Sequence, residues 1–362
     1  MAQQHLDPTD PTAGAVTGDA LAGYLRAQAT EFLRALRLHR ETGGQNGTEE
    51  SVDAARALRH SARRISGSLH TFRPLLDADW SEEMRPELAW LSGTLALEHA
   101  CAARLERLLL ALHRLSGSSA FPVQSVASAV GGRVTGAGRA TGNGPVPAPT
   151  PTAERGNLTV GAAKAGALLE RQLTLARTRA HSTALQALGS SRFHAVADKV
   201  AVLASEVPLT PAAATADLRP LAAAAGERLT DAVTALPLVT AGHPYNAEAL
   251  IHGLSPDPAP HPQDGPWHQV RLLLRLHRYA GEVLRPDGAP TDVRLLAAGQ
   301  ALNLHRDASE AAAAAAAAAR TPRIAPATAY ALGVLHADQR HEVEAARFAF
   351  QQSWQKQAVG TL

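Results

Sequence analysis

The sequence predicts an all-α protein, and three observations support this fold class. Aromatic residues make up only 4% of the 362 residues while alanine is abundant, so the core has to be built from Leu, Val and Ala. Such a core suits closely packed helices better than sheets. Apolar residues recur at helical spacing along most of the chain. The hydrophobic content of 45% is enough for one large or two ordinary domains.

In the first part of the chain, helices are expected over 19–40, 51–76, 81–115, 159–188 and 190–207. The third of these should begin with Ser81 as its cap, and the second should bury one apolar face. That face comprises Leu58, Ile65, Leu69 and Phe72. In the second part, helices are expected over 215–236, 266–285, 291–320 and 323–356. The segment 266–285 should carry one apolar face, which comprises Leu272, Leu276, Tyr279 and Val283.

Between these helices, composition suggests how the chain is divided. Residues 1–18 lack a periodic apolar face and are interpreted as a disordered tail. Residues 118–157 are rich in Gly, Pro and Thr, which indicates a flexible insertion. The first helical half therefore spans 19–207, including that insertion, and the second spans 208–358.

The two halves repeat one another. A helix with an arginine stripe, a short Asp/Pro turn and a Ser/Thr-started helix occur in both, as "RALRHSARRISGSLHTFRPLLDADWS" and "HQVRLLLRLHRYAGEVLRPDGAPT". Duplication of a helical unit predicts two four-helix-bundle-like halves related by a pseudo-twofold axis, with the matched helices as neighbours at the centre.

The matched helices concentrate positive charge on one face. His268, Arg271, Arg275 and Arg278 follow one another at helical spacing, and in the first half Arg56, Arg59, Arg63 and His70 do the same, with Arg64 beside them. Like charges on one face repel, and few acids are interspersed to offset this. Arginine forks suit phosphoryl oxygens, while His268 and His70 would add pH-dependent charge. We therefore expect a multivalent anion to bind where the two stripes converge.

The segment "PWHQVRLLLRLHRYAGEVLRP" resembles the signature helix of CHAD domains, histidine-containing α-helical domains that bind inorganic polyphosphate. The pattern H-x-x-R-x-x-x-[RK]-x-x-R-Y is complete from His268 to Tyr279. The first copy departs from it, with Arg56 where the family usually has His and Ser66 where it usually has Arg. The segment "SSRFHAVADKV" also resembles a family segment and adds Arg192 as a candidate.

The resemblance implies a non-catalytic module that binds polyphosphate for targeting, for storage granules or as an adaptor, possible partners being the granules or a triphosphatase-type protein. The alternative is a degenerate member of the family that binds a protein partner as a scaffold. Which applies depends on whether Arg56 and Ser66 leave a continuous basic surface.

Other classes of function have little support in the sequence. Metal-ligand motifs and the paired E-x-E-x-K strands of tunnel triphosphatases are missing, so neither a metal, a cofactor nor catalysis is expected. A net charge of +2 and arginines without interleaved aromatics make nucleic acid an unlikely ligand. One cysteine, no signal peptide and no apolar run of about 18 residues indicate a cytoplasmic protein that does not enter a membrane.

Overall fold

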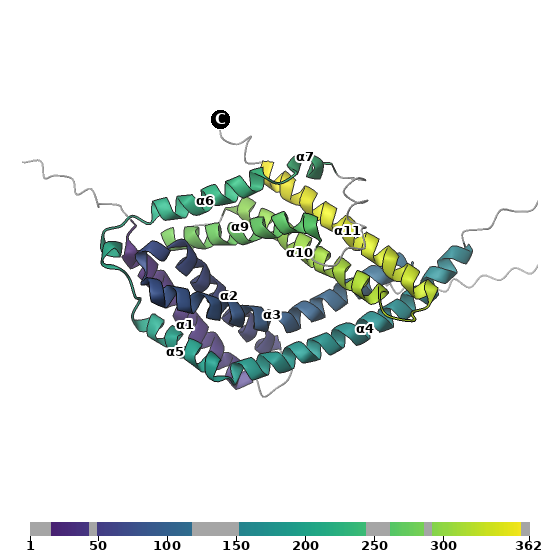
Figure 1. The fold of residues 1–362 in the computed structure, drawn as a ribbon, viewed down its shortest axis with the longest axis horizontal. Helices are drawn as coiled ribbons and strands as arrows, with labels where there is room; N and C mark the ends of the chain where they lie inside the picture. Colours follow the sequence, from purple (N-terminus) through teal and green to yellow (C-terminus); the bar gives the residue numbers. More distant parts are fainter. Residues whose placement is uncertain (1–15, 43–48, 118–151, 244–260, 286–291, 356–362) are drawn as a thin grey trace, which may run out of the picture.

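The structure is a computed structural model that describes residues 16–42, 49–117, 152–243, 261–285 and 292–355. These residues form ten α-helices and no strand, which confirms the all-α prediction (Figure 1). The helices are α1 (Gly18–Thr42), α2 (Glu49–Thr71), α3 (Ala78–Leu115), α4 (Thr152–Leu188), α5 (Ser191–Ser205), α6 (Arg219–Thr234), α7 (Leu238–Ala241), α9 (Gly265–Leu284), α10 (Val293–Ala319) and α11 (Pro326–Gln355).

Two predicted helix starts are corrected by the structure. The cap of α3 is Asp77, whose carboxylate accepts a hydrogen bond of 2.8 Å from the backbone N–H of Trp80; the predicted cap, Ser81, lies buried inside the helix. Helix α4 begins at Thr152, inside the segment expected to be a flexible insertion. The rest of that segment, 118–151, and most of the predicted tail lie outside the described residues.

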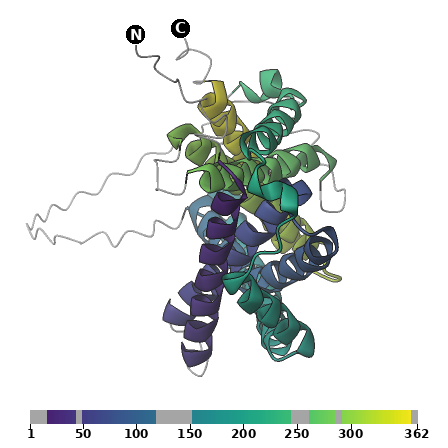
Figure 2. The same cartoon turned by 90° about the vertical axis from the view of Figure 1, so that its left-hand side faces the viewer.

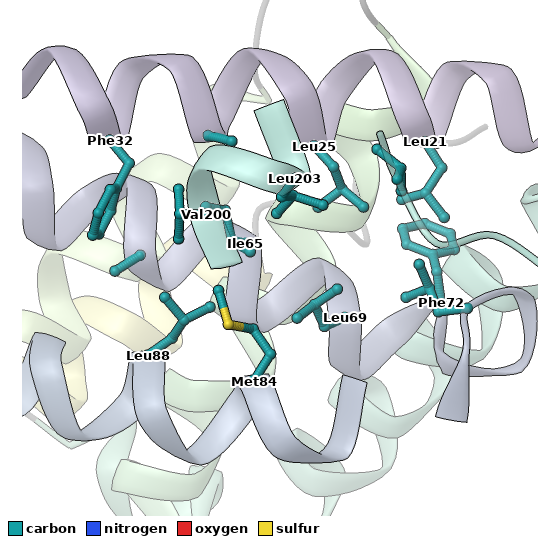
Figure 3. Packing of buried hydrophobic residues seen from close by; sticks show 14 of the residues in the cluster. Leu21, Leu25, Phe32, Ile65, Leu69, Phe72, Met84, Leu88, Val200 and Leu203 are labelled. Carbon is teal, nitrogen blue, oxygen red and sulfur yellow. The ribbon is translucent and has the colours of Figure 1, made fainter. Parts of the chain in front are cut away.

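The largest hydrophobic cluster joins α1, α2, α3 and α5 (Figure 3). The predicted core face of α2 is confirmed, since its four apolar side chains are fully buried. They pack against Leu21, Leu25 and Phe32 of α1. Residues of α6 and α9, among them Ala222 and Val283, also belong to this cluster, so it extends beyond the first half of the chain.

A second cluster combines both halves, because it contains Leu108 of α3, Leu169 of α4, Ala315 of α10 and Leu335 of α11. A third joins α6, α7, α9, α10 and α11 around Trp267. The helices of the C-terminal part, green to yellow, lie mostly on one side of the molecule, as Figure 2 shows. The pseudo-twofold axis stays a prediction, and two of the three clusters take residues from both halves.

The apolar face expected on α9 is buried only at Val283. Leu272 is 42% exposed, and Leu276 and Tyr279 are half-buried, whereas Trp267, Val270, Leu274 and Ala280 fill the core. The predicted face therefore points partly into the cavity described below. Both faces of α9 carry leucines, and helical spacing alone does not tell which of two apolar faces meets a neighbour.

The start of α9 is fixed by a buried charge. Asp264 is fully buried and accepts hydrogen bonds from Arg340 (2.8 and 3.2 Å), Arg347 (2.7 Å) and Ser309 (2.6 Å). Burial alone would favour the neutral acid, but hydrogen bonds from Arg340 and its charge lower the pKa of Asp264 to about 2. The carboxylate thus ties α9 to α10 and α11 and sets where the basic face of α9 lies.

No helix in the described ranges is both long and apolar enough to cross a membrane.

Candidate polyanion-binding groove

Helices α2 and α9 come into direct contact at Gly67. A Cβ atom at this position would lie 2.6 Å from Cδ2 of Tyr279 and 3.3 Å from Cδ2 of Leu276. The missing side chain therefore lets the ring of Tyr279 rest against the backbone of α2. Arg63 lies one helical turn before Gly67, and Arg275 lies one turn before Tyr279, so this contact brings the two arginines together.

Two cavities share Arg63, one helical turn from this contact, and together we call them the basic groove. The larger, of about 380 Å³, lies between α2, α3 and α9 and is lined by Arg63, His70, Arg85 and Arg275 among others. The smaller, of about 220 Å³, lies between α2, α3 and α10 and is lined by Arg59, Arg63, His99, Arg104, Arg107 and Arg306 together with Asp307 and Glu310. Arg63 belongs to both walls, so the two cavities adjoin.

Arg63 in the groove and the nearby Arg271 are both destabilised in their charged form. Burial, together with the charges of Arg275 and Arg59, lowers the pKa of Arg63 to about 10. The pKa of Arg271 falls to about 9, because of burial first and then of Arg275, Arg306 and Arg63. No carboxylate of the described residues lies within ion-pair distance of Arg63 or Arg275. A bound polyanion would supply the missing negative charge.

Arg59 and Arg271 share a neighbour rather than a cavity wall. Arg59 lines the smaller cavity, and Arg271 donates a hydrogen bond of 2.8 Å to the side chain of Asn303 on α10. The pKa of each is lowered by burial and also by the charge of Arg306. Arg56 lies further along α2, where it pairs with Asp53 at 2.8 Å. The predicted stripes therefore converge around Arg306.

His70 lies in the larger cavity, where its Nδ1 is 3.0 Å from Nη2 of Arg85. Because a guanidinium can only donate, this nitrogen acts as the acceptor, and the ring is neutral. Burial and the charge of Arg85 lower the pKa of His70. Arg85 also lines the wall that contains Ser66, the position where an arginine would be usual in CHAD domains.

His268 and Arg278 flank the groove and do not line either cavity. The ring of His268 meets His305 edge to face at 5.5 Å, beside the buried Asp264. Burial lowers the pKa of His268, with Arg271 and Arg306 contributing in the same direction and Asp264 opposing. Arg278 is half-buried and faces α10, since a Cβ on Gly299 would lie 3.9 Å from its Nη1.

Two predicted site residues lie apart from the groove. Nε of Arg64 lies 2.9 Å from Oε2 of Glu282, which also accepts a hydrogen bond of 2.7 Å from the hydroxyl of Tyr24. Arg192 donates to both carboxylate oxygens of Glu87 (2.6 and 3.1 Å) and stacks over Trp90, 4.0 Å from the ring centroid. Both guanidiniums already have a carboxylate partner, so the structure does not bring them to the anion site.

Sequence reasoning missed the wall that α3 and α10 contribute, namely Arg85, His99, Arg104, Arg107 and Arg306. A signal was present on α3, where Arg85, Ala89, Ser92, Ala96, His99, Ala103 and Arg107 follow one another at steps of three or four residues. Along this face, small side chains alternate with cations. This pattern is typical of a groove wall, because the small side chains leave room for a ligand. Arg306 gave no such signal.

Carboxylates screen one end of the groove. Arg104 pairs with Glu310 at 2.5 Å, and Arg306 contacts both Asp307 and Glu310. At the opposite end, Arg63 and Arg275 pair with neither Asp307 nor Glu310.

Nowhere in the described ranges do three His, Cys, Asp or Glu side chains come close enough to hold a metal ion.

The chain is thus an all-helical protein in which α2 and α9 line one basic groove with Arg63 and Arg275. The CHAD domain model matches residues 27–316, so the chain belongs to the CHAD family, a membership consistent with a polyphosphate-related function.

The chain is also similar to a solved structure, PptA from Streptomyces chartreusis. The two are 70% identical with a TM-score of 0.74, over 94% of this chain and 99% of that one. No curated protein matches the chain.

Proposed function

We propose that this protein binds inorganic polyphosphate in the basic groove and acts without catalysis, as a targeting, storage-granule or adaptor module. The observation that carries the proposal is the pair Arg63 and Arg275, two half-buried guanidiniums that line one cavity without a carboxylate partner among the described residues. Repulsion between buried like charges costs free energy, and a chain of phosphates relieves it.

The walls of the groove fit a linear polyanion. Arginine forks bind phosphoryl oxygens with two parallel hydrogen bonds, and the low polarity of a half-buried site strengthens each bond. The cations follow one another from Arg59 through Arg63 to Arg275, so successive phosphates meet successive arginines.

The alternative, a scaffold protein, depended on Arg56 and Ser66, the two positions at which the first copy of the repeat departs from the family pattern. Ser66 faces the cavity, but Arg85 of α3 supplies a guanidinium to the same wall. Arg56 lines neither cavity of the groove and pairs with Asp53 at 2.8 Å. The basic wall of the groove therefore continues past Ser66, which supports polyphosphate as the ligand. We further propose a cytoplasmic, granule-associated location, where a triphosphatase-type protein is a candidate partner.

The test is calorimetric titration of long-chain polyphosphate into the wild type and the double variant Arg63→Glu/Arg275→Glu. We expect the variant to lose binding while its helical circular dichroism stays unchanged. Arg192→Glu is the matched control, because Arg192 lies outside the groove, and it should bind like the wild type. For about six engaged phosphates, log affinity should fall with log salt at a slope of about −4. Binding that survives the double variant would contradict the proposal.

A further inference from the structure

A third cavity, of about 220 Å³, opens from the basic groove between α1, α2, α3 and α4. Arg59 and His99 line both this side cavity and the groove, so the two spaces adjoin. A polyphosphate chain alone gives no reason for the side cavity, because phosphates do not gain from apolar walls.

The far walls of the side cavity are apolar. Leu95 and Ala184 are buried, while Leu185 is 52% exposed at the rim. Such a surface favours a ring or another apolar body over a phosphate. The cavity is smaller than the roughly 300 Å³ at which drug-sized pockets begin, so it suits one compact ring system.

Polar groups are placed within reach of such a ring. Glu98 is held by His181 at 2.9 Å and by Arg177 at 3.8 Å, and its carboxylate lines the cavity. A carboxylate offers about four lone-pair positions, so Glu98 keeps capacity to accept hydrogen bonds from ring N–H or amino groups. At the boundary with the groove, Arg59 has a buried Nε without a partner among the described residues.

We propose that the side cavity binds the base of a purine nucleoside polyphosphate, whose phosphates lie in the basic groove beside Arg59 and Arg63. This inference rests on the proposed function, because it uses the groove as the phosphate site. The base would rest on the apolar wall and donate its N–H groups to Glu98. The protein would thereby distinguish a nucleotide from inorganic phosphate chains of the same length.

ATP and inorganic tripolyphosphate separate these two ligand classes. Both carry three linked phosphates, but tripolyphosphate carries more negative charge, so a purely electrostatic groove would bind tripolyphosphate at least as tightly as ATP. With a base pocket the order reverses, and we expect the wild type to bind ATP about tenfold more tightly. The measurement is calorimetric titration of each ligand in EDTA.

Adjacent alanines on α3 provide matched variants. Ala102 lines the side cavity and Ala103 lines the groove. Ala102→Phe should remove the preference for ATP and leave tripolyphosphate binding unchanged, whereas Ala103→Phe should weaken both ligands. Leu185→Asn is a second cavity variant at an exposed position, which avoids any loss of folding, and it should reduce ATP binding alone.

Three results would decide against the side cavity. One is a wild type that binds ATP no more tightly than tripolyphosphate, and the others are Ala102→Phe weakening both ligands equally or Leu185→Asn leaving ATP binding unchanged. Long-chain polyphosphate titrated in parallel tests the groove separately. If it binds while ATP shows no advantage, the base pocket is wrong and the proposed function stands; if no phosphate ligand binds, both are wrong.

Discussion

Arg63 on α2 and Arg275 on α9 line the same cavity although 212 positions separate them in the sequence. Each lies one turn before a residue of the contact between the two helices, Gly67 on α2 and Tyr279 on α9. The approach of Arg63 to Arg275 thus depends on one glycine, which lets the ring of Tyr279 lie against α2.

Gly67→Ala should destabilise the protein, although alanine normally stabilises a helix over glycine by about 1 kcal/mol. The new Cβ would overlap the ring of Tyr279 and push α2 away from α9. Gly93→Ala on α3 is the control, because nothing lies within 4 Å of the Cβ position there, and it should gain stability. Urea unfolding measures both. Equal gains in the two variants would show that the contact with Tyr279 is not tight.

Arg275→Met should make the free protein more stable while it weakens polyphosphate binding. The pKa of Arg275 is lowered by burial and by the charge of Arg306, so the buried charge costs free energy when no ligand is bound. Replacing it with an apolar chain should gain about 1 kcal/mol, a typical size for removing functional strain. Arg37→Met, at an exposed position on α1, should change neither property. A loss of stability in Arg275→Met would show that this arginine is structural.

Asp264→Asn should destabilise the protein by about 3 kcal/mol or more, because it leaves Arg340 buried without a countercharge and leaves Arg347 with Glu344 alone. Asp217→Asn, which loses only an exposed pair with Arg219, is the control and should stay within about 0.5 kcal/mol of the wild type. Denaturant unfolding measures the difference. A small effect of Asp264→Asn would mean that the network rearranges around the amide.

Polyphosphate affinity should rise as pH falls from about 8 to about 6, because the bound anion favours imidazolium and binding takes up protons. His70 and His99, which line the groove and have lowered pKa values in the free protein, should carry most of this effect. His70→Ala should therefore flatten the pH profile more than His268→Ala. Calorimetry in buffers of different ionisation enthalpy counts the protons, and zero uptake would remove histidine from the mechanism.

The same histidines determine how the stability of the free protein changes with pH. Their folded-state pKa values lie below that of an unfolded imidazole, so the unfolded state binds more protons below a pH of about 6.5. The histidines should contribute their full share to the free energy of unfolding above that pH, and this contribution should be lost as the pH falls below it. Polyphosphate should reduce this loss, and thermal unfolding with and without ligand at pH 5.5 and 7.5 tests it.

The sequence by itself determined the helices and the two stripes, because both follow from spacing within one helix. The core face of α2 and the signature of α9 depend on neighbours three or four positions apart, and such local patterns are visible without a fold. Arg59, Arg63 and Arg275 could therefore be named as candidates, and the family could be recognised from His268 to Tyr279.

Only the tertiary structure decided which cations share the groove. Arg64 and Arg192 sit in equally basic segments, but each meets a carboxylate from another helix, Glu282 and Glu87, and is neutralised outside the groove. Arg306 and Arg85 join the site from α10 and α3 because of where those helices pack, a relationship between residues far apart in the chain. Charge screening depends on distance in space, and spacing along one helix does not contain that distance.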